Sequence, residues 1–119
     1  MEKTPPFRVE LLRPCDGVAV VALQGEVDIH SASQFKGALF QAVSEGARRV
    51  IIDLTKVCFM DSTALGVVVS GLKAIKVHGG GLDIVCPKQS IRGILAATGL
   101  DQVMGIYHSR GQALAAAGQ

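Results

Sequence analysis

The sequence predicts one α/β domain over residues 1–119, with an ordered core of about residues 7–117. A chain of 119 residues has the usual length of a single domain. Its residues are 49% hydrophobic but only 4% aromatic, which indicates a core of Val, Ile, Leu and Ala. Short apolar runs alternate with stretches of helical periodicity. We therefore expect a mixed, mainly parallel five-stranded sheet with about four helices, in the order ββαβαβαβα.

The first two strands are expected to form a hairpin. Residues 7–13 are predicted to be the first strand, and residues 14–17 supply the turn after it. Residues 18–23 form a continuous apolar run, which is typical of a strand buried on both faces. Residues 24–30 contain several polar side chains and are predicted to form a loop.

Two strand–helix units are expected to follow. The first helix is predicted to begin at Ser31, because the sequence SASQ matches the capping box Ser-x-x-Gln, and to end at Gly46. Residues 50–54 are predicted to be the third strand. A short link over residues 55–61 then leads to the second helix, residues 62–78.

The C-terminal third completes the sheet. Residues 82–86 are predicted to form the fourth strand, and residues 91–98 the third helix, with Gly99 in its C′ position. Residues 103–107 are predicted to be the fifth strand. A second capping box opens the last helix, residues 109–117.

The composition excludes several classes of function. The net charge is only +2, and the basic residues are scattered, so no nucleic-acid partner is predicted. The three cysteines, Cys15, Cys58 and Cys86, are too far apart for a zinc site or a Cys-x-x-Cys pair. Buried free thiols in a reducing cytoplasm explain them best.

The chain is expected to be a soluble cytoplasmic protein. Its first residues lack the apolar segment of a secretion signal. The most apolar stretch, residues 50–72, contains charged residues at Asp53, Lys56 and Asp61, which are too many for a membrane span. No membrane partner is therefore predicted.

No cofactor or metal site is predicted. The three glycines at 79–81 lack the Gly-Lys-Ser/Thr ending of a P-loop and follow a helix, so they are interpreted as a helix stop. Asp28, Asp53 and Asp61 are expected near strand ends at one edge of the sheet, where they could bind Mg²⁺. Helix caps and solvated loop charges are the commoner roles for such residues.

The second predicted helix has unusually small side chains outside its apolar stripe. Two glycines inside a helix cost roughly 1 kcal/mol each, so a packing or docking role is expected to offset them. One interpretation is close contact with a neighbouring helix, and the other is a smooth surface for another protein. The small positions are Thr63, Gly66, Val67, Ser70, Gly71 and Ala74.

Ser62, at the start of this helix, has three possible roles. It could be an N-cap, whose hydroxyl accepts a backbone N–H. It could be a phosphoacceptor, because a helix start favours an anion. It could also be a catalytic nucleophile, but no Gly-x-Ser-x-Gly elbow surrounds it. The histidines that could serve as its base each stand alone in the sequence.

Several segments match a known family in the right order. The sequences DLT at 53–55 and MDSTALG at 60–66 resemble the Asp-Ser-(Ser/Thr)-Gly-Leu-Gly phosphorylation motif of the anti-sigma factor antagonists. The sequence GEVD at 25–28 is similar to the Gly-Glu-x-Asp segment of that family. GL at 81–82 and TGL at 98–100 also fit. Together these segments identify the chain as resembling a STAS domain along nearly its whole length.

The resemblance implies partner switching in transcription regulation, as in bacterial stress response or sporulation. In that family the unphosphorylated antagonist binds an anti-sigma factor that is also a serine kinase, so a sigma factor is freed. The kinase uses ATP to phosphorylate the serine that corresponds to Ser62, and the complex then separates. A phosphatase resets the system. Such a protein is not an enzyme, and free it is expected to be a monomer or a weak dimer.

The resemblance also implies the residues of the site. Asp28 matches the family's acidic position beside the serine, and Thr63 is a less favoured second acceptor. The expected partner-binding residues are Asp28, Asp61, Ser62, Thr63, Gly66, Val67 and Ser70.

The sequence departs from the family at Ala64, where many members have Gly. Ala should stiffen this first helical turn and could slow phosphorylation.

Two alternatives to the antagonist function remain open. The domain could be a STAS scaffold subunit of a transporter or signalling assembly, or a small hydrolase that uses Ser62.

Overall fold

The five strands form one sheet in the order β1-β2-β3-β4-β5. The computed structural model describes residues 5–118. β1 pairs with β2 in antiparallel orientation, whereas the pairings of β2 with β3, β3 with β4 and β4 with β5 are parallel. The predicted mixed, mainly parallel sheet is therefore confirmed. The strands are β1 (Arg8–Cys15), β2 (Val18–Val27), β3 (Arg49–Met60), β4 (Gly81–Val85) and β5 (Ile106–Tyr107).

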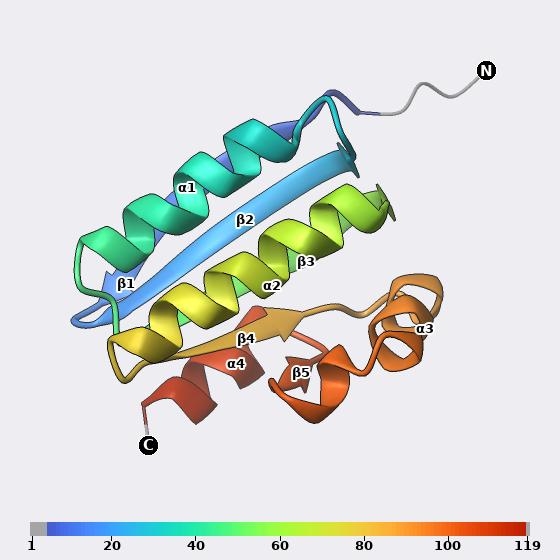
Figure 1. Cartoon of the computed structure of the whole chain (residues 1–119). Helices are drawn as coiled ribbons and strands as arrows, with labels where there is room; N and C mark the ends of the chain where they lie inside the picture. Colours follow the sequence, from blue (N-terminus) through green and yellow to red (C-terminus); the bar gives the residue numbers. More distant parts are fainter. Residues whose placement is uncertain (1–4, 119) are drawn as a thin grey trace.

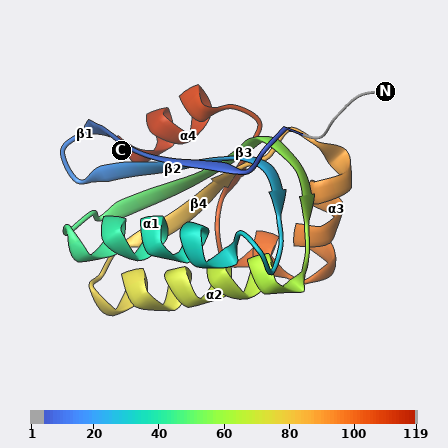
Figure 2. The same cartoon turned by 90° about the horizontal axis from the view of Figure 1, so that it is seen from above.

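Helices cover both faces of this sheet (Figures 1 and 2). α1 and α2 lie side by side on one face, α4 packs on the opposite face, and α3 lies beyond the end of β4. The predicted element order is confirmed, with one additional short 3₁₀ turn, η1. The helical elements are α1 (Ala32–Ser44), α2 (Ser62–Val77), α3 (Gln89–Ala97), η1 (Leu100–Gln102) and α4 (Arg110–Ala117).

The core has two apolar layers, because the central strands are covered on both faces. Val21 and Ile52 belong to the layer under α1 and α2. Their chain neighbours Val20 and Ile51 pack instead with Ala113 of α4. Successive residues of a strand point to opposite faces, so a strand covered on both sides needs an apolar residue at every position. This explains the continuous apolar runs in the sequence.

β2 and β3 both continue past the ends predicted for them. Much of the segments 24–30 and 55–61, predicted to be loops, instead extends β2 to Val27 and β3 to Met60. The two extensions pair in parallel as far as Val27↔Met60, so each satisfies backbone groups of the other. Register shifts interrupt this pairing, and they disturb the alternation by which a strand is recognised in a sequence.

The C-terminal elements follow the prediction with shifted ends. Gly99 has a φ of 78° and occupies the predicted C′ position after α3. The turn η1 follows it directly, so β5 is only two residues long instead of spanning 103–107. Half of the predicted capping box of α4 is present: the Ser109 hydroxyl accepts a hydrogen bond from the backbone N–H of Gln112 at 3.2 Å, whereas the Gln112 side chain accepts from the N–H of His108 and not from that of Ser109.

The prediction that all three cysteines are buried is wrong for two of them. Cys86 lies in the core, whereas Cys15 and Cys58 are exposed. Cys15 is the last residue of the edge strand β1. Cys58 lies on the extension of β3, which is not covered by helices on both of its faces. All three are free thiols.

β1 is one edge of the sheet, and it is tied to α1 by an ion pair. The Arg13 guanidinium donates two hydrogen bonds of 2.7 Å to the carboxylate of Glu45, the residue that caps the C-terminus of α1. These bonds, with a further one from Gln41, lower the pKa of Glu45 to about 2. Both partners are exposed, so the pair orients the strand more than it stabilises the fold.

Gly71 lets α1 and α2 approach closely. A Cβ at this position would overlap the Cδ2 methyl of Leu39 on α1 and lie 2.9 Å from its Cγ. Leu39 is fully buried, so its side chain has little room to move. At Gly66, in the same helix, no atom lies within 4 Å of the corresponding position. Helix packing therefore explains Gly71 but not Gly66.

We predict opposite effects of the same substitution at these two glycines. Gly71→Ala should lower the free energy of unfolding by about 1 kcal/mol, because overpacking exceeds the gain in helix propensity. Gly66→Ala should raise it by about 0.5–1 kcal/mol. Urea denaturation followed by circular dichroism measures both. Equal stabilisation by the two substitutions would show that the helices are not in tight contact at Gly71.

Candidate functional site

The extended strands β2 and β3 end side by side and bring two acidic residues together at the carboxyl ends of these strands. The last pair is Val27↔Met60, and the backbone N–H of Asp61 donates to the Val27 carbonyl at 3.2 Å. Asp28 and Asp61 therefore directly follow the ends of two neighbouring strands, β2 and β3. These strand ends lie at the upper right of Figure 1, where α2 begins.

Asp61, and not Ser62, is the N-cap of α2. Asp61 has extended backbone angles, and its Oδ1 accepts a hydrogen bond from the N–H of Ala64 at 3.0 Å. Ser62 is the first residue of the helix, and its exposed hydroxyl has no hydrogen-bond partner among residues 5–118. The N-cap interpretation of Ser62 is therefore wrong. Asp is as favourable as Ser at the N-cap position, so the sequence already offered an N-cap residue one position before Ser62.

The loop between β2 and α1 is held by Asp28 and Ser31. The Asp28 carboxylate accepts hydrogen bonds from the N–H groups of His30, at 2.9 Å, and Ser31, at 3.3 Å. The buried Ser31 hydroxyl donates to the Glu26 carbonyl and accepts from the Asp28 N–H, each at 3.0 Å. Ser31 precedes α1 but forms no side-chain cap, so the predicted capping box is absent there.

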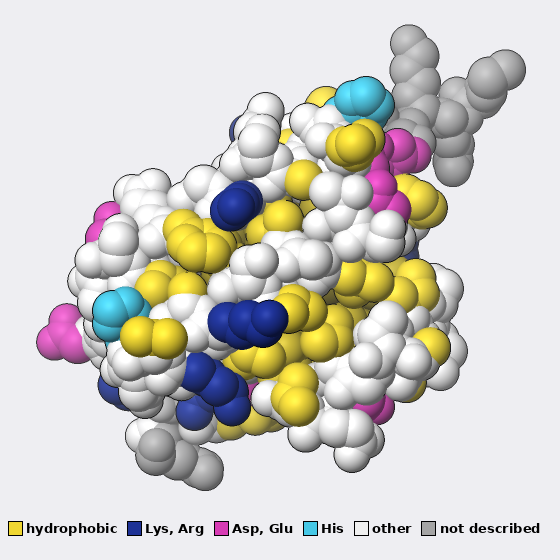
Figure 3. Space-filling view, in the orientation of Figure 1, with side chains coloured by type: hydrophobic (Ala, Val, Ile, Leu, Met, Phe, Trp, Pro, Cys, Tyr) yellow, Lys and Arg dark blue, Asp and Glu magenta, His cyan; other side chains and the backbone are white. Residues whose placement is uncertain are grey.

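The first half of α2 carries no charged side chain, whereas Asp61 directly precedes Ser62 and Asp28 follows the end of the neighbouring strand. Thr63, Gly66 and Ser70 are exposed on α2, as the docking-surface interpretation requires. Val67 is only 8% exposed, so it offers little surface of its own. Figure 3 shows uncharged and apolar surface over the first half of α2, with Lys and Arg side chains nearer its C-terminal half.

Two exposed apolar side chains near the ends of β2 and β3 were missed by the sequence analysis. Ile29, in the loop after Asp28, is 68% exposed, and Phe59, near the end of β3, is 48% exposed. Phe59 pairs with Glu26, and the next pair, Val27↔Met60, faces the α1 and α2 layer, so Phe59 points to the opposite face of the sheet. Because apolar residues in segments predicted to be loops carry no periodic signal, only the structure shows that these two face solvent.

Ala64 does not obstruct the site. Its side chain is fully buried beneath the first turn of α2, whereas Ser62 and Thr63 are exposed. The departure from the family's glycine therefore places a methyl group in the core and not on the surface around Ser62.

The three aspartates expected at one edge are not brought together. Asp53 lies on the α4 side of the sheet, where it pairs with Arg110 at 2.8 Å. Within residues 5–118, no group of three or more His, Cys, Asp or Glu side chains is placed to hold a metal ion.

None of the described histidines is hydrogen-bonded to Ser62. His30, His78 and His108 are all exposed, and none of these three described side chains forms a hydrogen bond with the Ser62 hydroxyl. A serine nucleophile needs such a base within hydrogen-bond reach.

In the part of the chain that the structure describes, no helix is long and apolar enough to cross a membrane.

Comparison with known proteins identifies the family. The STAS domain model matches residues 12–113. The anti-sigma-B factor antagonist of Staphylococcus epidermidis is 31% identical over 72% of this chain and 80% of its own length. The chain belongs to the STAS domain family, with anti-sigma factor antagonists as its relatives.

Solved structures of the STAS family share the fold over nearly the whole chain. An anti-sigma factor antagonist from Mycobacterium paratuberculosis superposes with a TM-score of 0.84 at 26% identity and covers 93% of each chain. The Bacillus cell fate determinant SpoIIAA, solved in its phosphorylated form, has a TM-score of 0.75 at 22% identity and covers 92% of this chain and 99% of that one. The STAS fold is therefore shared.

We predict that the first turn of α2 depends on Asp61 and not on the Ser62 hydroxyl. Asp61→Ala should lower the free energy of unfolding by about 1 kcal/mol, because the N–H of Ala64 loses its partner. Ser62→Ala should change it by less than about 0.5 kcal/mol. Asp61→Ser, which keeps a capping oxygen, is the matched control and should restore most of the loss. A larger loss for Ser62→Ala than for Asp61→Ala in urea denaturation would contradict this assignment.

Proposed function

We propose that this STAS domain is an anti-sigma factor antagonist whose unphosphorylated form binds an anti-sigma factor with serine kinase activity and frees a sigma factor. In this proposal the kinase uses ATP to phosphorylate Ser62, the complex separates, and a phosphatase restores the binding form. The observation that supports it best is the exposed Ser62 hydroxyl, which the Asp61 cap leaves free at the first position of α2. The family relatives support the same function.

Ser62 is the acceptor that the geometry favours. The hydroxyl of Ser31 is buried and bonded, and that of Ser109 caps α4, so neither is available without a local rearrangement. Thr63 is exposed and remains the second choice. At Ser62 a phosphate would lie at the positive end of the α2 dipole, a favourable interaction of roughly 0.3–1 kcal/mol at an exposed site.

The proposed binding surface combines the predicted polar positions with the exposed Ile29. The small side chains on α2 let a partner approach its backbone closely, and Ile29 supplies apolar area that gains free energy when it is covered. Asp28 holds the neighbouring loop and offers one acidic group to the partner. The surface residues are Asp28, Ile29, Asp61, Ser62, Thr63, Gly66 and Ser70, with Val67 beneath them.

Electrostatics at the interface explains release in this proposal. A phosphoserine adds about −1.5 to −2 charges at pH 7. Within the domain, repulsion from Asp61 and Asp28 opposes the helix dipole, so the two effects nearly cancel. Against a partner that offers no cation, a buried unpaired charge costs about 2–5 kcal/mol, or thirtyfold or more in affinity. The fold therefore remains while the complex separates.

Phosphorylation should occur on Ser62. Incubation of the full chain with its partner kinase and Mg-ATP should place one phosphate there, as mapped by mass spectrometry. Ser62→Ala should take up none, whereas Thr63→Ala should still be modified on Ser62 because the Ser62 hydroxyl is intact. Modification confined to Thr63, Ser31 or Ser109 would refute the assignment of the acceptor.

A negative charge at residue 62 should abolish partner binding without unfolding the domain. Ser62→Asp should weaken binding to the anti-sigma factor by about thirtyfold or more in titration calorimetry. Its melting temperature should stay within a few degrees of wild type. Ser90→Asp is the matched control, because Ser90 is also exposed in the first turn of a helix, on α3, and should keep wild-type affinity. Weak binding that only follows a much lower melting temperature would show that release acts through unfolding.

A further inference from the structure

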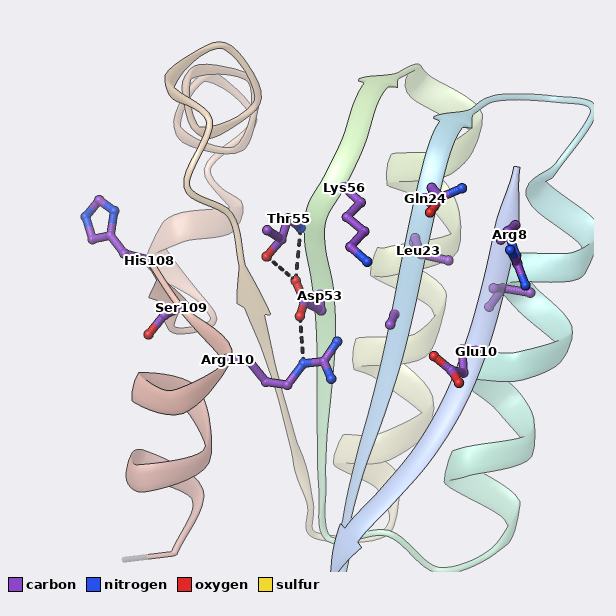
Figure 4. A pocket seen from close by; sticks show the side chains of 12 residues that line it. Arg8, Glu10, Leu23, Gln24, Asp53, Thr55, Lys56, His108, Ser109 and Arg110 are labelled. Atoms are coloured by element: carbon purple, nitrogen blue, oxygen red, sulfur yellow. Dashed lines mark hydrogen bonds and ion pairs between the residues drawn. The ribbon is translucent and has the colours of Figure 1, made fainter. Parts of the chain in front are cut away.

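The face of the sheet opposite α1 and α2 is only partly covered. α4 packs against β3, β4 and β5 and against Val20 of β2, whereas the same face of β1 and of the later parts of β2 and β3 lies open beside its N-terminus. A groove of about 660 Å³ occupies this space. Figure 4 shows that polar side chains from β1, β2, β3 and α4 point into it.

A row of side chains that donate hydrogen bonds crosses the floor of the groove. Arg8 on β1 pairs with Gln24 on β2, and Gln24 pairs with Lys56 on β3. Adjacent strands lie about 4.8 Å apart, so the backbone positions of Arg8 and Lys56 lie about 10 Å apart with that of Gln24 between them. Among the described residues neither Arg8 nor Lys56 forms an ion pair. Their charges are therefore available to a ligand.

Arg110 supplies a third cation, and a buried carboxylate holds it in place. Its Nε donates to Asp53 Oδ2 at 2.8 Å, and Asp53 is only 5% exposed. The other oxygen of Asp53 accepts from the Thr55 backbone N–H at 2.9 Å and from its hydroxyl. Burial alone would raise the pKa of Asp53, but the bonds from Thr55 and Arg110 outweigh it and lower the pKa. Asp53 is therefore charged at neutral pH.

This arrangement leaves the outer part of the Arg110 guanidinium free. Its Nε is bonded to Asp53, while the two terminal nitrogens point over β3 towards β2 in Figure 4 and have no partner among the described residues. Two parallel N–H groups on a guanidinium match the oxygens of a phosphate. Holding Arg110 before a ligand arrives removes part of the entropy cost of binding.

The remaining groups of the groove suit hydroxyl groups more than an aromatic ring. Glu10 and Gln24 offer oxygens that accept hydrogen bonds, and Thr55 offers a hydroxyl. No Phe, Tyr or Trp side chain lines the groove among the described residues, and the ring of His108, which does line it, points away from Arg110 and Lys56 in Figure 4. Asp53 is neutralised by Arg110, so the free charges are those of Arg8 and Lys56 against Glu10.

We propose that this groove binds a small phosphorylated sugar or polyol. The phosphate lies between Arg110 and Lys56, with Arg8 contributing at longer range, and the hydroxyl groups of the ligand bond to Glu10 and Gln24. A volume of about 660 Å³ lies within the range of about 300–1,000 Å³ usual for small-molecule sites. The proposal concerns the opposite face from α2 and does not depend on phosphorylation of Ser62.

The test is a titration of the ¹⁵N-labelled full chain with ribose 5-phosphate, followed by NMR. We expect saturable shifts at the amides of Gln24, Thr55, Lys56 and Arg110. Ribose alone and sodium chloride at equal ionic strength should not reproduce them, and inorganic phosphate should bind about fivefold more weakly. Equal shifts with sodium chloride or ribose would overturn the proposal, as would shifts centred on Ser62. Equal affinity for inorganic phosphate would overturn the assignment of a polyol.

Substitutions of exposed groove residues separate binding from folding. Lys56→Ala and Arg8→Ala should each weaken binding, by about fivefold or more for Lys56, and leave the thermal melt unchanged because both side chains are exposed. Lys73→Ala, at an exposed position on α2, is the matched control and should bind as wild type. Unchanged affinity in Lys56→Ala, or an equal loss in Lys73→Ala, would overturn the proposal.

Discussion

The parallel pairing of β2 with β3 beyond the helix-covered core is the constraint on which the site depends. The pairing ends at Val27↔Met60 and is closed by the hydrogen bond from Asp61 to Val27. Because of this bond, the start of α2 has a fixed position relative to the loop before α1. Asp61 then caps α2, and Asp28 holds the loop, so two aspartates fix the surroundings of Ser62 through backbone hydrogen bonds. The hydroxyl of Ser62 is left unoccupied within this rigid frame.

The two faces of the sheet differ in how they are covered. On one face, α1 and α2 pack tightly, with Gly71 against Leu39, and carry the surface around Ser62. On the other, the short helix α4 covers only part of the sheet and is fixed by the ion pair of Arg110 with Asp53. The same central strands thus support the proposed binding surface and the separate groove. A substitution in one need not disturb the other.

The sequence predicts most of the fold but less of the site. Apolar runs and helix stops depend on local chemistry, so the element order and the position of Gly99 follow from sequence alone. The extensions of β2 and β3 do not, because their stability comes from pairing with each other across a long separation in the chain. For the same reason the exposure of Ile29, Phe59 and Cys58 could not be predicted. The family resemblance identified Ser62, whereas only the structure shows that Asp61 performs the capping.

The two edge strands bear on whether separate chains can join through their sheets. An exposed strand edge is a hazard, because its unpaired backbone groups can join chains into aggregates. Here β5 is only two residues long, and β1 contains Arg8, Glu10, Arg13 and Pro14. Charge and proline at one edge, and brevity at the other, disfavour self-association through the sheet.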